Sequence, residues 1–451
     1  MKVPAHQRFT LANGVRLILM PRHEIPLLAF EAVVRGGARL NAAEHAGLAS
    51  LSAELLTRGA GDREAYAFAE AIEDVGGSLE ADAHSEAVVL HGNFLAKDVA
   101  LAIELLADAL QSPHLAGEEF ETLRERRIEF ISAAKDSEPQ SLIGAYGRSM
   151  LFAHHAYGAP IGGSESSLAS LRREHLLKFY QQQFGADRLT LSFAGDFDPE
   201  SLRDALAARF ASWRAAALPL QALATPARVR GRRVLLIDAP GSAQTYFWIA
   251  NVGVARHYAQ RAALDVTNTA FGGSFGSMLN QALRVRSGLT YSIDSGFRRG
   301  SVPGEFAISS FTQTASTAQA LQITLQTLAS LKRDGVSEAG IESARSYILG
   351  QYPMAFETSG DWAGALADLD LYQLPQSDIE EYDSQLRQVD ARASMQVVRT
   401  AFPSADDIDI VLIGDADRIR AQAADFGPVL EKSLEAPDFL PQTPEVVVSC
   451  E

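Results

Sequence analysis

The sequence predicts an α+β protein built from two homologous α/β-sandwich-like domains, each a mostly antiparallel sheet covered by helices. Three repeated segments predict this duplication. A strand that runs into a proline, an apolar strand that ends in glycine and a strand that ends in Gly-Asp each occur twice, in the same order and at an offset of 217 to 219 residues. The pairs are 15–21 with 233–240, 29–36 with 246–253, and 189–196 with 408–415.

Repeats that keep one order and nearly one offset divide the chain into two related halves. We place the N-terminal domain at 1–215 and the C-terminal domain at 231–451. The segment between them, 216–230, is rich in Ala, Pro and Leu and has little periodicity, which is typical of a linker. At ~150 residues per domain, a chain of 451 residues leaves each half long enough for its own core.

The first half begins with a predicted β-hairpin. Asn13-Gly14 stands between apolar positions of 9–11 and 15–19, and this dipeptide is the strongest short-range hairpin signal. Apolar spacing then predicts a helix over 42–56, packed on the sheet. The remaining predicted elements are a strand over 88–95 and helices over 98–110 and 118–134.

The second half follows the same pattern. Its strands are predicted near 233–238, 245–252, 290–298 and 303–311, and its helices over 315–332 and 337–350. Strands joined by tight turns, with helices gathered in long separate runs, favour α+β layers over a doubly wound parallel sheet.

Composition excludes several classes of protein. The chain has 40 Lys+Arg against 56 Asp+Glu, a net charge of −16, which argues against nucleic acid as a partner and is compatible with basic or neutral substrates. The one cysteine, Cys450, excludes an internal disulfide and a thiolate metal cluster. No run of 18 apolar residues predicts a membrane span. Because no signal peptide is visible, we expect a cytoplasmic protein, or a periplasmic one if a signal peptide was removed.

Conventional catalytic motifs are absent from the sequence. It contains no P-loop, no G-x-G-x-x-G and no H-E-x-x-H. The segment 272–276 fits G-x-S-x-G, but its approach over 262–270 predicts a helix where a nucleophile elbow needs a strand. A flexible or closely packed backbone segment is therefore the preferred interpretation. His45 and Glu54 lie half a turn out of phase on the predicted helix, so they are not expected to share a metal ion.

The order of several short motifs resembles the pitrilysin/insulinase-like zinc metallopeptidases, especially the mitochondrial-processing-peptidase type. The motifs run along nearly the whole chain, at 11–15, 35–39, 47–49, 59–60, 155–160, 194–196, 271–274 and 283–291. Each is weak alone, and their joint order and spacing carry the resemblance. It implies the two-domain α+β fold predicted above.

The resemblance also implies that this chain has lost its zinc motif. Catalytic members carry H-x-x-E-H on the helix after Gly-x-Ala, with both His on one face and the Glu acting on the zinc-bound water. At the matching positions this sequence has Ser50, Ala53 and Glu54. The third ligand of the family would fall near Phe130 or Ile131, and neither can bind a metal. We therefore expect no metal and no cofactor in this chain, with zinc held by a partner subunit.

A second family feature is kept. Arg284 and Tyr291 match an Arg/Tyr pair, seven residues apart, that in the family contacts the substrate and stabilises the oxyanion at the zinc site. The sequence predicts a helix end over 280–286, a stop at Gly288 and a strand that opens at Tyr291. From the residues alone, a solvated helix arginine and a half-buried strand tyrosine remain the alternative.

Together these features predict the non-zinc subunit of a heteromeric metallopeptidase, inactive alone. The expected partners are a homologous subunit that carries H-x-x-E-H, in a heterodimer, and extended or unfolded peptides that add to a sheet edge. Two alternatives stay open. One is a catalytically inert structural subunit that resembles respiratory-complex core proteins, and the other is a peptide-binding homodimer without catalysis.

Overall fold

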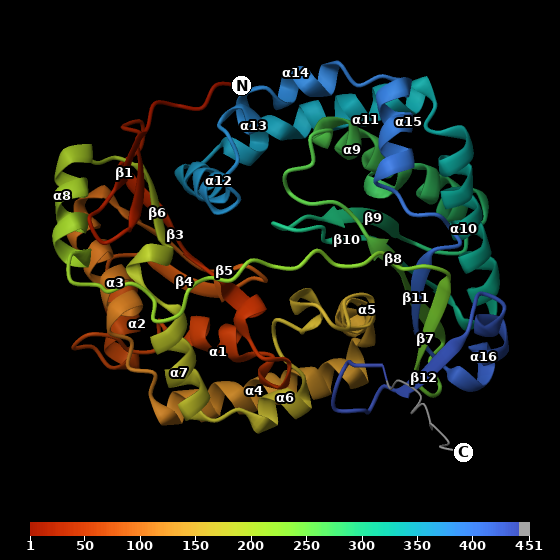
Figure 1. Ribbon diagram of the computed structural model, residues 1–451, viewed down its shortest axis with the longest axis horizontal. Helices are drawn as coiled ribbons and strands as arrows, with labels where there is room; N and C mark the ends of the chain where they lie inside the picture. The colour runs from red at the N-terminus through yellow and green to blue at the C-terminus, as the bar shows by residue number, and fades with distance from the viewer. Residues whose placement is uncertain (442–451) are drawn as a thin grey trace. The chain divides into compact units, whose positions relative to one another are not determined.

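The computed structural model describes residues 1–441, and Cys450 lies outside the described residues. The chain forms two compact units, and each is assembled from three separate segments (Figure 1). Unit 1 contains 1–131, 159–222 and 351–382, and unit 2 contains 132–158, 223–350 and the residues from 383 onward. The prediction of an α+β fold with a duplicated, helix-covered sheet is confirmed, since each unit contains one six-stranded sheet.

The sheet of unit 1 has the strand order β1-β2-β6-β3-β5-β4 and is antiparallel except between β2 and β6. Its strands are β1 (Gln7–Thr10), β2 (Arg16–Pro21), β3 (Leu27–Arg35), β4 (Ser78–Ala83), β5 (Ala87–Leu95) and β6 (Leu189–Gly195). The predicted hairpin joins β1 to β2. Gly14 takes a φ of 94°, and the side-chain amide of Asn13 donates to the carbonyl of Phe210 at 2.7 Å.

Helices cover this sheet. The helices of unit 1 are α1 (Leu48–Leu55), α2 (Ala65–Glu73), α3 (Val99–Gln111), α4 (Gly117–Ser137), whose residues from 132 onward belong to unit 2, α6 (Glu165–Ser170), α7 (Arg173–Gln183), α8 (Pro199–Phe210), α12 (Ser359–Leu371) and α13 (Ser377–Glu380). The helix predicted over 42–56 was too long. Gly47 has a φ of 95°, so α1 begins only at Leu48, and a short 3₁₀ turn, Ala43–His45, precedes it.

The sheet of unit 2 repeats the arrangement, with the order β12-β7-β11-β8-β10-β9 and parallel pairing of β7 with β11 and β12. Its strands are β7 (Arg232–Asp238), β8 (Gln244–Val252), β9 (Ile293–Arg298), β10 (Glu305–Gln313), β11 (Ile408–Gly414) and β12 (Val429–Ser433). The helices are α5 (Ile143–Leu151), α9 (Arg261–Asn268), α10 (Thr317–Asp334), α11 (Glu338–Gln351), α14 (Tyr382–Arg387), α15 (Ala391–Thr400) and α16 (Ala416–Ala424). Two short π-type helices, Thr269–Gly273 and Asn280–Arg286, follow α9.

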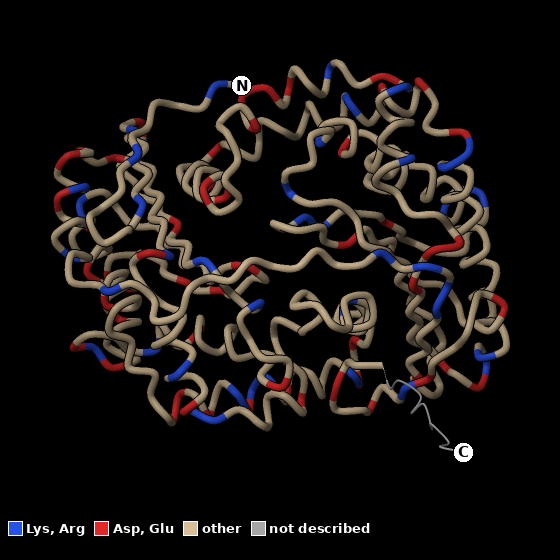
Figure 2. Tube along the Cα trace, viewed as in Figure 1, with Lys and Arg blue, Asp and Glu red and all other residues tan. Residues whose placement is uncertain are grey.

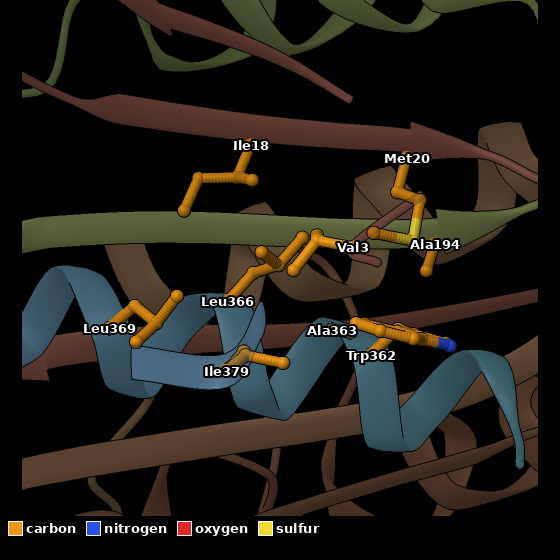
Figure 3. Packing of buried hydrophobic residues seen from close by; sticks show 9 residues of the cluster. All are labelled: Val3, Ile18, Met20, Ala194, Trp362, Ala363, Leu366, Leu369 and Ile379. Carbon is orange, nitrogen blue, oxygen red and sulfur yellow. The ribbon is translucent and has the colours of Figure 1, made fainter. Parts of the chain in front are cut away.

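A segment from each half of the sequence belongs to the unit formed mainly by the other half: 351–382, with α12 and α13, to unit 1, and 132–158, with α5, to unit 2. Helix α12 lies on β3 and β6 of unit 1, and α5 lies on β8 and β11 of unit 2. Figure 3 shows Trp362, Ala363 and Leu366 of α12 against Ile18 and Met20 of β2. The compact units therefore differ from the predicted halves by this exchange of helices.

A close glycine contact recurs at each exchanged helix. A Cβ on Gly147 of α5 would lie 2.5 Å from the Trp248 ring, and one on Gly364 of α12 would lie 2.8 Å from a carboxylate oxygen of Glu31. Both pairs are related by the 217-residue offset that relates the repeated segments in the sequence. The duplication thus extends to how each helix meets its sheet.

Basic and acidic residues are interspersed along the trace rather than separated into long runs of one sign (Figure 2). Within residues 1–441, no helix has the length and apolar character needed to cross a membrane.

Candidate functional site

Arg284 lies in the last turn of the π-type helix Asn280–Arg286 in unit 2. Gly288, with a φ of 62°, reverses the chain, and the amide of Leu289 donates to the carbonyl of Leu283 at 2.8 Å. The chain then passes Tyr291 and enters β9 at Ile293, two residues later than the strand start predicted from the sequence. This tight reversal returns Tyr291 to the end of the helix that carries Arg284.

The structure brings Arg284 and Tyr291 into contact. The guanidinium carbon of Arg284 lies 4.4 Å from the centroid of the Tyr291 ring, and 4.7 Å from that of Phe275. Tyr291 is 71% exposed and Phe275 is 64% exposed. Among the residues that the structure describes, neither the side chain of Arg284 nor that of Tyr291 forms a hydrogen bond or an ion pair.

This arrangement is a cation–π cluster with unused donors. The rings attract the guanidinium through their electron-rich faces, while its N–H groups and the phenol O–H remain available to a ligand. Such a set of donors suits a carbonyl oxygen, a carboxylate or a developing oxyanion.

The loop that carries Phe275 is anchored to the start of β9. The buried amide of Asn280 donates to the carbonyl of Ile293 at 2.8 Å and to that of Ser274 at 3.2 Å. One side chain therefore ties together the Phe275 loop, the Arg284 helix and the segment that leads from Tyr291.

The G-x-S-x-G segment at 272–276 is not a nucleophile elbow. A helix, α9, and a short π-type helix lead into it, as expected from the sequence, and the hydroxyl of Ser274 donates to the carbonyl of Thr269 at 3.1 Å. Phe275 is the residue of this segment that sequence reasoning missed. The available signal was an aromatic residue within a segment of three glycines, but its exposure cannot be read from the sequence of the segment alone.

The positions that the sequence comparison matched to the family's zinc motif lie on α1 in unit 1. Ser50 and Ala53 are buried, and the side chain of Glu54 is 28% exposed. One carboxylate oxygen of Glu54 accepts from Arg127 of α4 at 2.9 Å, and the other lies 3.5 Å from the guanidinium of Arg58. The Glu54 carboxylate thus already has two cationic neighbours.

These residues do not fit a zinc ion. Phe130 is 70% exposed, Ile131 is buried, and both have hydrocarbon side chains. Across residues 1–441, no group of three or more His, Cys, Asp and Glu side chains is placed to hold a metal. Glu54 instead lines an open pocket of about 470 Å³ that borders the edge strand β4.

Comparisons with known proteins agree with this fold. Residues 28–165 match the family model described as insulinase (peptidase family M16), and residues 170–348 match the peptidase M16 inactive domain. An uncharacterized zinc protease of Mycobacterium leprae is 27% identical over 81% of this chain and 82% of its own length. An uncharacterized zinc protease of Bacillus subtilis is 24% identical over 78% and 85%.

Two solved structures share the fold over nearly the whole chain. A peptidase M16 inactive domain from Pseudomonas fluorescens superposes with a TM-score of 0.84 at 20% identity, covering 91% of this chain and 98% of that one. A protease from Helicobacter pylori gives 0.82 at 18% identity, covering 91% and 100%.

Proposed function

We propose that this chain, which belongs to the insulinase-like M16 family of peptidases, is the non-zinc subunit of a heteromeric zinc metallopeptidase. In this proposal a homologous partner carries H-x-x-E-H and the zinc ion. This chain contributes Arg284 and Tyr291 to the partner's site, where they bind the substrate and stabilise the oxyanion.

The observation that carries the proposal is the contact between Arg284 and Tyr291. Both keep all their side-chain donors free of partners within the described residues, although they lie together on the surface. A structural arginine is normally neutralised by a carboxylate or by carbonyl groups. A stacked, unneutralised pair is instead suited to accept an anionic or carbonyl ligand from outside the chain.

The proposal also rests on the degenerate motif positions Ser50, Ala53 and Glu54. Zn²⁺ bound here would be a third cation beside Arg127 and Arg58, both of which already lie within 3.5 Å of the carboxylate of Glu54. We therefore infer that zinc is bound by the partner and not by this chain. The substrates we propose are extended or unfolded peptides.

The test is reconstitution. The chain is purified alone and together with homologous chains of the same organism that carry H-x-x-E-H, and cleavage of a flexible peptide is measured with and without a chelator. We expect cleavage only in the mixture, with sensitivity to the chelator. In that mixture Arg284→Ala and Tyr291→Phe should each lower kcat/KM by about 100-fold, the usual effect of losing one oxyanion donor.

Arg286→Ala is the matched control, since Arg286 is an exposed arginine on the same helix without a ring contact. It should leave cleavage unchanged. An active mixture in which Arg284→Ala and Tyr291→Phe lose nothing would contradict the catalytic contribution and favour an inert structural subunit. Stoichiometric zinc in the isolated chain, measured by elemental analysis, would contradict the assignment of the metal to the partner.

A further inference from the structure

We propose that Phe275 is a positioning residue for Arg284, holding its guanidinium in the orientation that receives the substrate. The inference rests on the proposed function of Arg284, and it adds to the site a residue from a segment that no catalytic motif explains. Phe275 acts through Arg284 and does not itself touch the substrate.

Two rings share one guanidinium. Phe275 and Tyr291 lie 4.7 Å and 4.4 Å from its central carbon, yet they form no ring contact with each other within the described residues. The two rings therefore approach the guanidinium carbon from different directions. Contacts from two rings restrict the guanidinium more than one ring can, while its N–H groups stay free to donate.

The backbone holds Phe275 at this place through contacts that do not involve its own ring. Ser274, its neighbour, is fixed by the hydroxyl bond to Thr269 and by the amide of Asn280. The same Asn280 amide donates to Ile293 at the start of β9, beyond Tyr291. Because one buried amide bonds to both segments, the fold holds the backbone beside Phe275 close to the backbone that follows Tyr291.

Exposure argues against a packing role for Phe275. A side chain that leaves 64% of its surface in water gains little from burial, so the core would not need an aromatic residue here. The contact with Arg284 explains why an aromatic ring is present at this exposed position. A long arginine side chain loses rotamer freedom on binding, and a guanidinium that is already held loses less.

The first test uses the reconstituted peptidase. Phe275→Leu keeps an apolar side chain but removes the ring, and should lower kcat/KM by about 2- to 5-fold, the range of an exposed cation–π contact. Phe275→Tyr keeps the ring and should restore the wild-type value. Val285→Ala is the matched control, because Val285 is a 54% exposed apolar neighbour without a ring contact. Equal losses in Phe275→Leu and Phe275→Tyr would overturn the proposal.

A double-mutant cycle separates positioning from direct substrate contact. In an Arg284→Ala background, Phe275→Leu should cause no further loss of kcat/KM, because the group that it positions is gone. A full additional loss in that background would show that Phe275 contacts the substrate itself, and the positioning role would be wrong.

A second test does not depend on any partner. In the isolated chain labelled with ¹⁵N-arginine, the side-chain resonance of Arg284, assigned through Arg284→Lys, should be shifted by the ring currents of both aromatic residues. Phe275→Leu and Tyr291→Leu should each reduce this shift. If Tyr291→Leu changes the resonance and Phe275→Leu does not, the positioning role fails even if the peptidase proposal holds. If both change it while reconstitution fails, only the proposed function is lost.

Discussion

Glu31, at the centre of β3, lies where the exchanged helix α12 meets the sheet of unit 1. Burial raises the pKa of its carboxyl group, His91 on β5 lowers the pKa, and Asp368 on α12 raises it further. Gly364 leaves the space that this carboxylate occupies. Because burial is the largest cause, the folded protein favours the protonated form of Glu31 more than the unfolded chain does.

Glu31→Gln should therefore stabilise the protein near neutral pH. Above the folded-state pKa, Glu31 is ionised in both states and its burial opposes folding, whereas below the ordinary value of 4.5 it is protonated in both and costs nothing. The gain in thermal midpoint over wild type should be largest at pH 7 and vanish as the pH falls below 4.5. Glu70→Gln, on the exposed face of α2, should show no such gain. A gain that persists at low pH would contradict this account.

Single residues also show where sequence reasoning ends. The proximity of Arg284 and Tyr291 could be predicted because they lie seven residues apart in one local motif, and the structure brings them into contact, while their role at a catalytic site stays a prediction. The neutralisation of Glu54 by Arg127 could not be predicted, because the two residues are 73 positions apart and meet only through helix packing. The contact of Phe275 with Arg284 could not be predicted either, because it depends on how the chain turns between these two residues.

At the scale of elements, helices and strands with strong apolar periodicity were predicted well, whereas a polar strand at the edge of a sheet was missed. The strand predicted at 88–95 corresponds to β5, and the helices predicted at 98–110 and 118–134 correspond to α3 and α4. The neighbouring edge strand β4, with the sequence Ser-Leu-Glu-Ala-Asp-Ala, was not predicted. It pairs on one side only and buries little, so its sequence lacks the apolar alternation that marks a strand.

The close contact of α5 with its sheet predicts that a larger residue at Gly147 destabilises the protein. Gly147→Ala would place a methyl group 2.5 Å from the Trp248 ring, and overpacking of this kind should destabilise unit 2 by about 1–3 kcal/mol, less a few tenths to ~1 kcal/mol regained in helix propensity. Gly350→Ala on α11 is the control, since a Cβ added there would meet no atom within 4 Å outside its own stretch of helix. It should stabilise by up to ~1 kcal/mol.

Both variants can be compared by urea unfolding, followed through tryptophan fluorescence. Unit 2 contains Trp248, whereas Trp213 and Trp362 belong to unit 1. A Gly147→Ala midpoint equal to or above that of Gly350→Ala would show that the close approach on α5 is not maintained in solution.

At the scale of the whole molecule, the repeated segments predict the duplication but not the exchange of helices. The offset of 217 to 219 residues is a property of the sequence, whereas the position of α12 on β3 and β6 is set by contacts made far along the chain. The predicted boundaries at 215 and 231 follow the repeat, and the compact units follow these contacts.

The exchange predicts that neither half folds alone. A fragment of residues 1–222 lacks α12 and leaves Ile18, Met20 and Ala194 without their cover, and a fragment of 223–451 lacks α5. We expect each to be insoluble or to lack a cooperative transition when produced separately, and a soluble complex when both are produced together. Size-exclusion chromatography and circular dichroism would decide. A cooperative unfolding transition in either fragment alone would contradict the expectation.

The exchange also determines when, during synthesis of the chain, the first sheet becomes covered. Strand β6 completes the first sheet at Gly195, but the helix that covers one of its faces ends at Leu371, so with ribosomes adding ~5–20 residues per second the nascent chain carries an uncovered apolar surface for roughly 10 to 35 seconds. During that interval the polypeptide is a natural client for chaperones. A chain that terminates before α12 cannot complete unit 1. Its sheet keeps an uncovered apolar face, which cellular quality control can recognise.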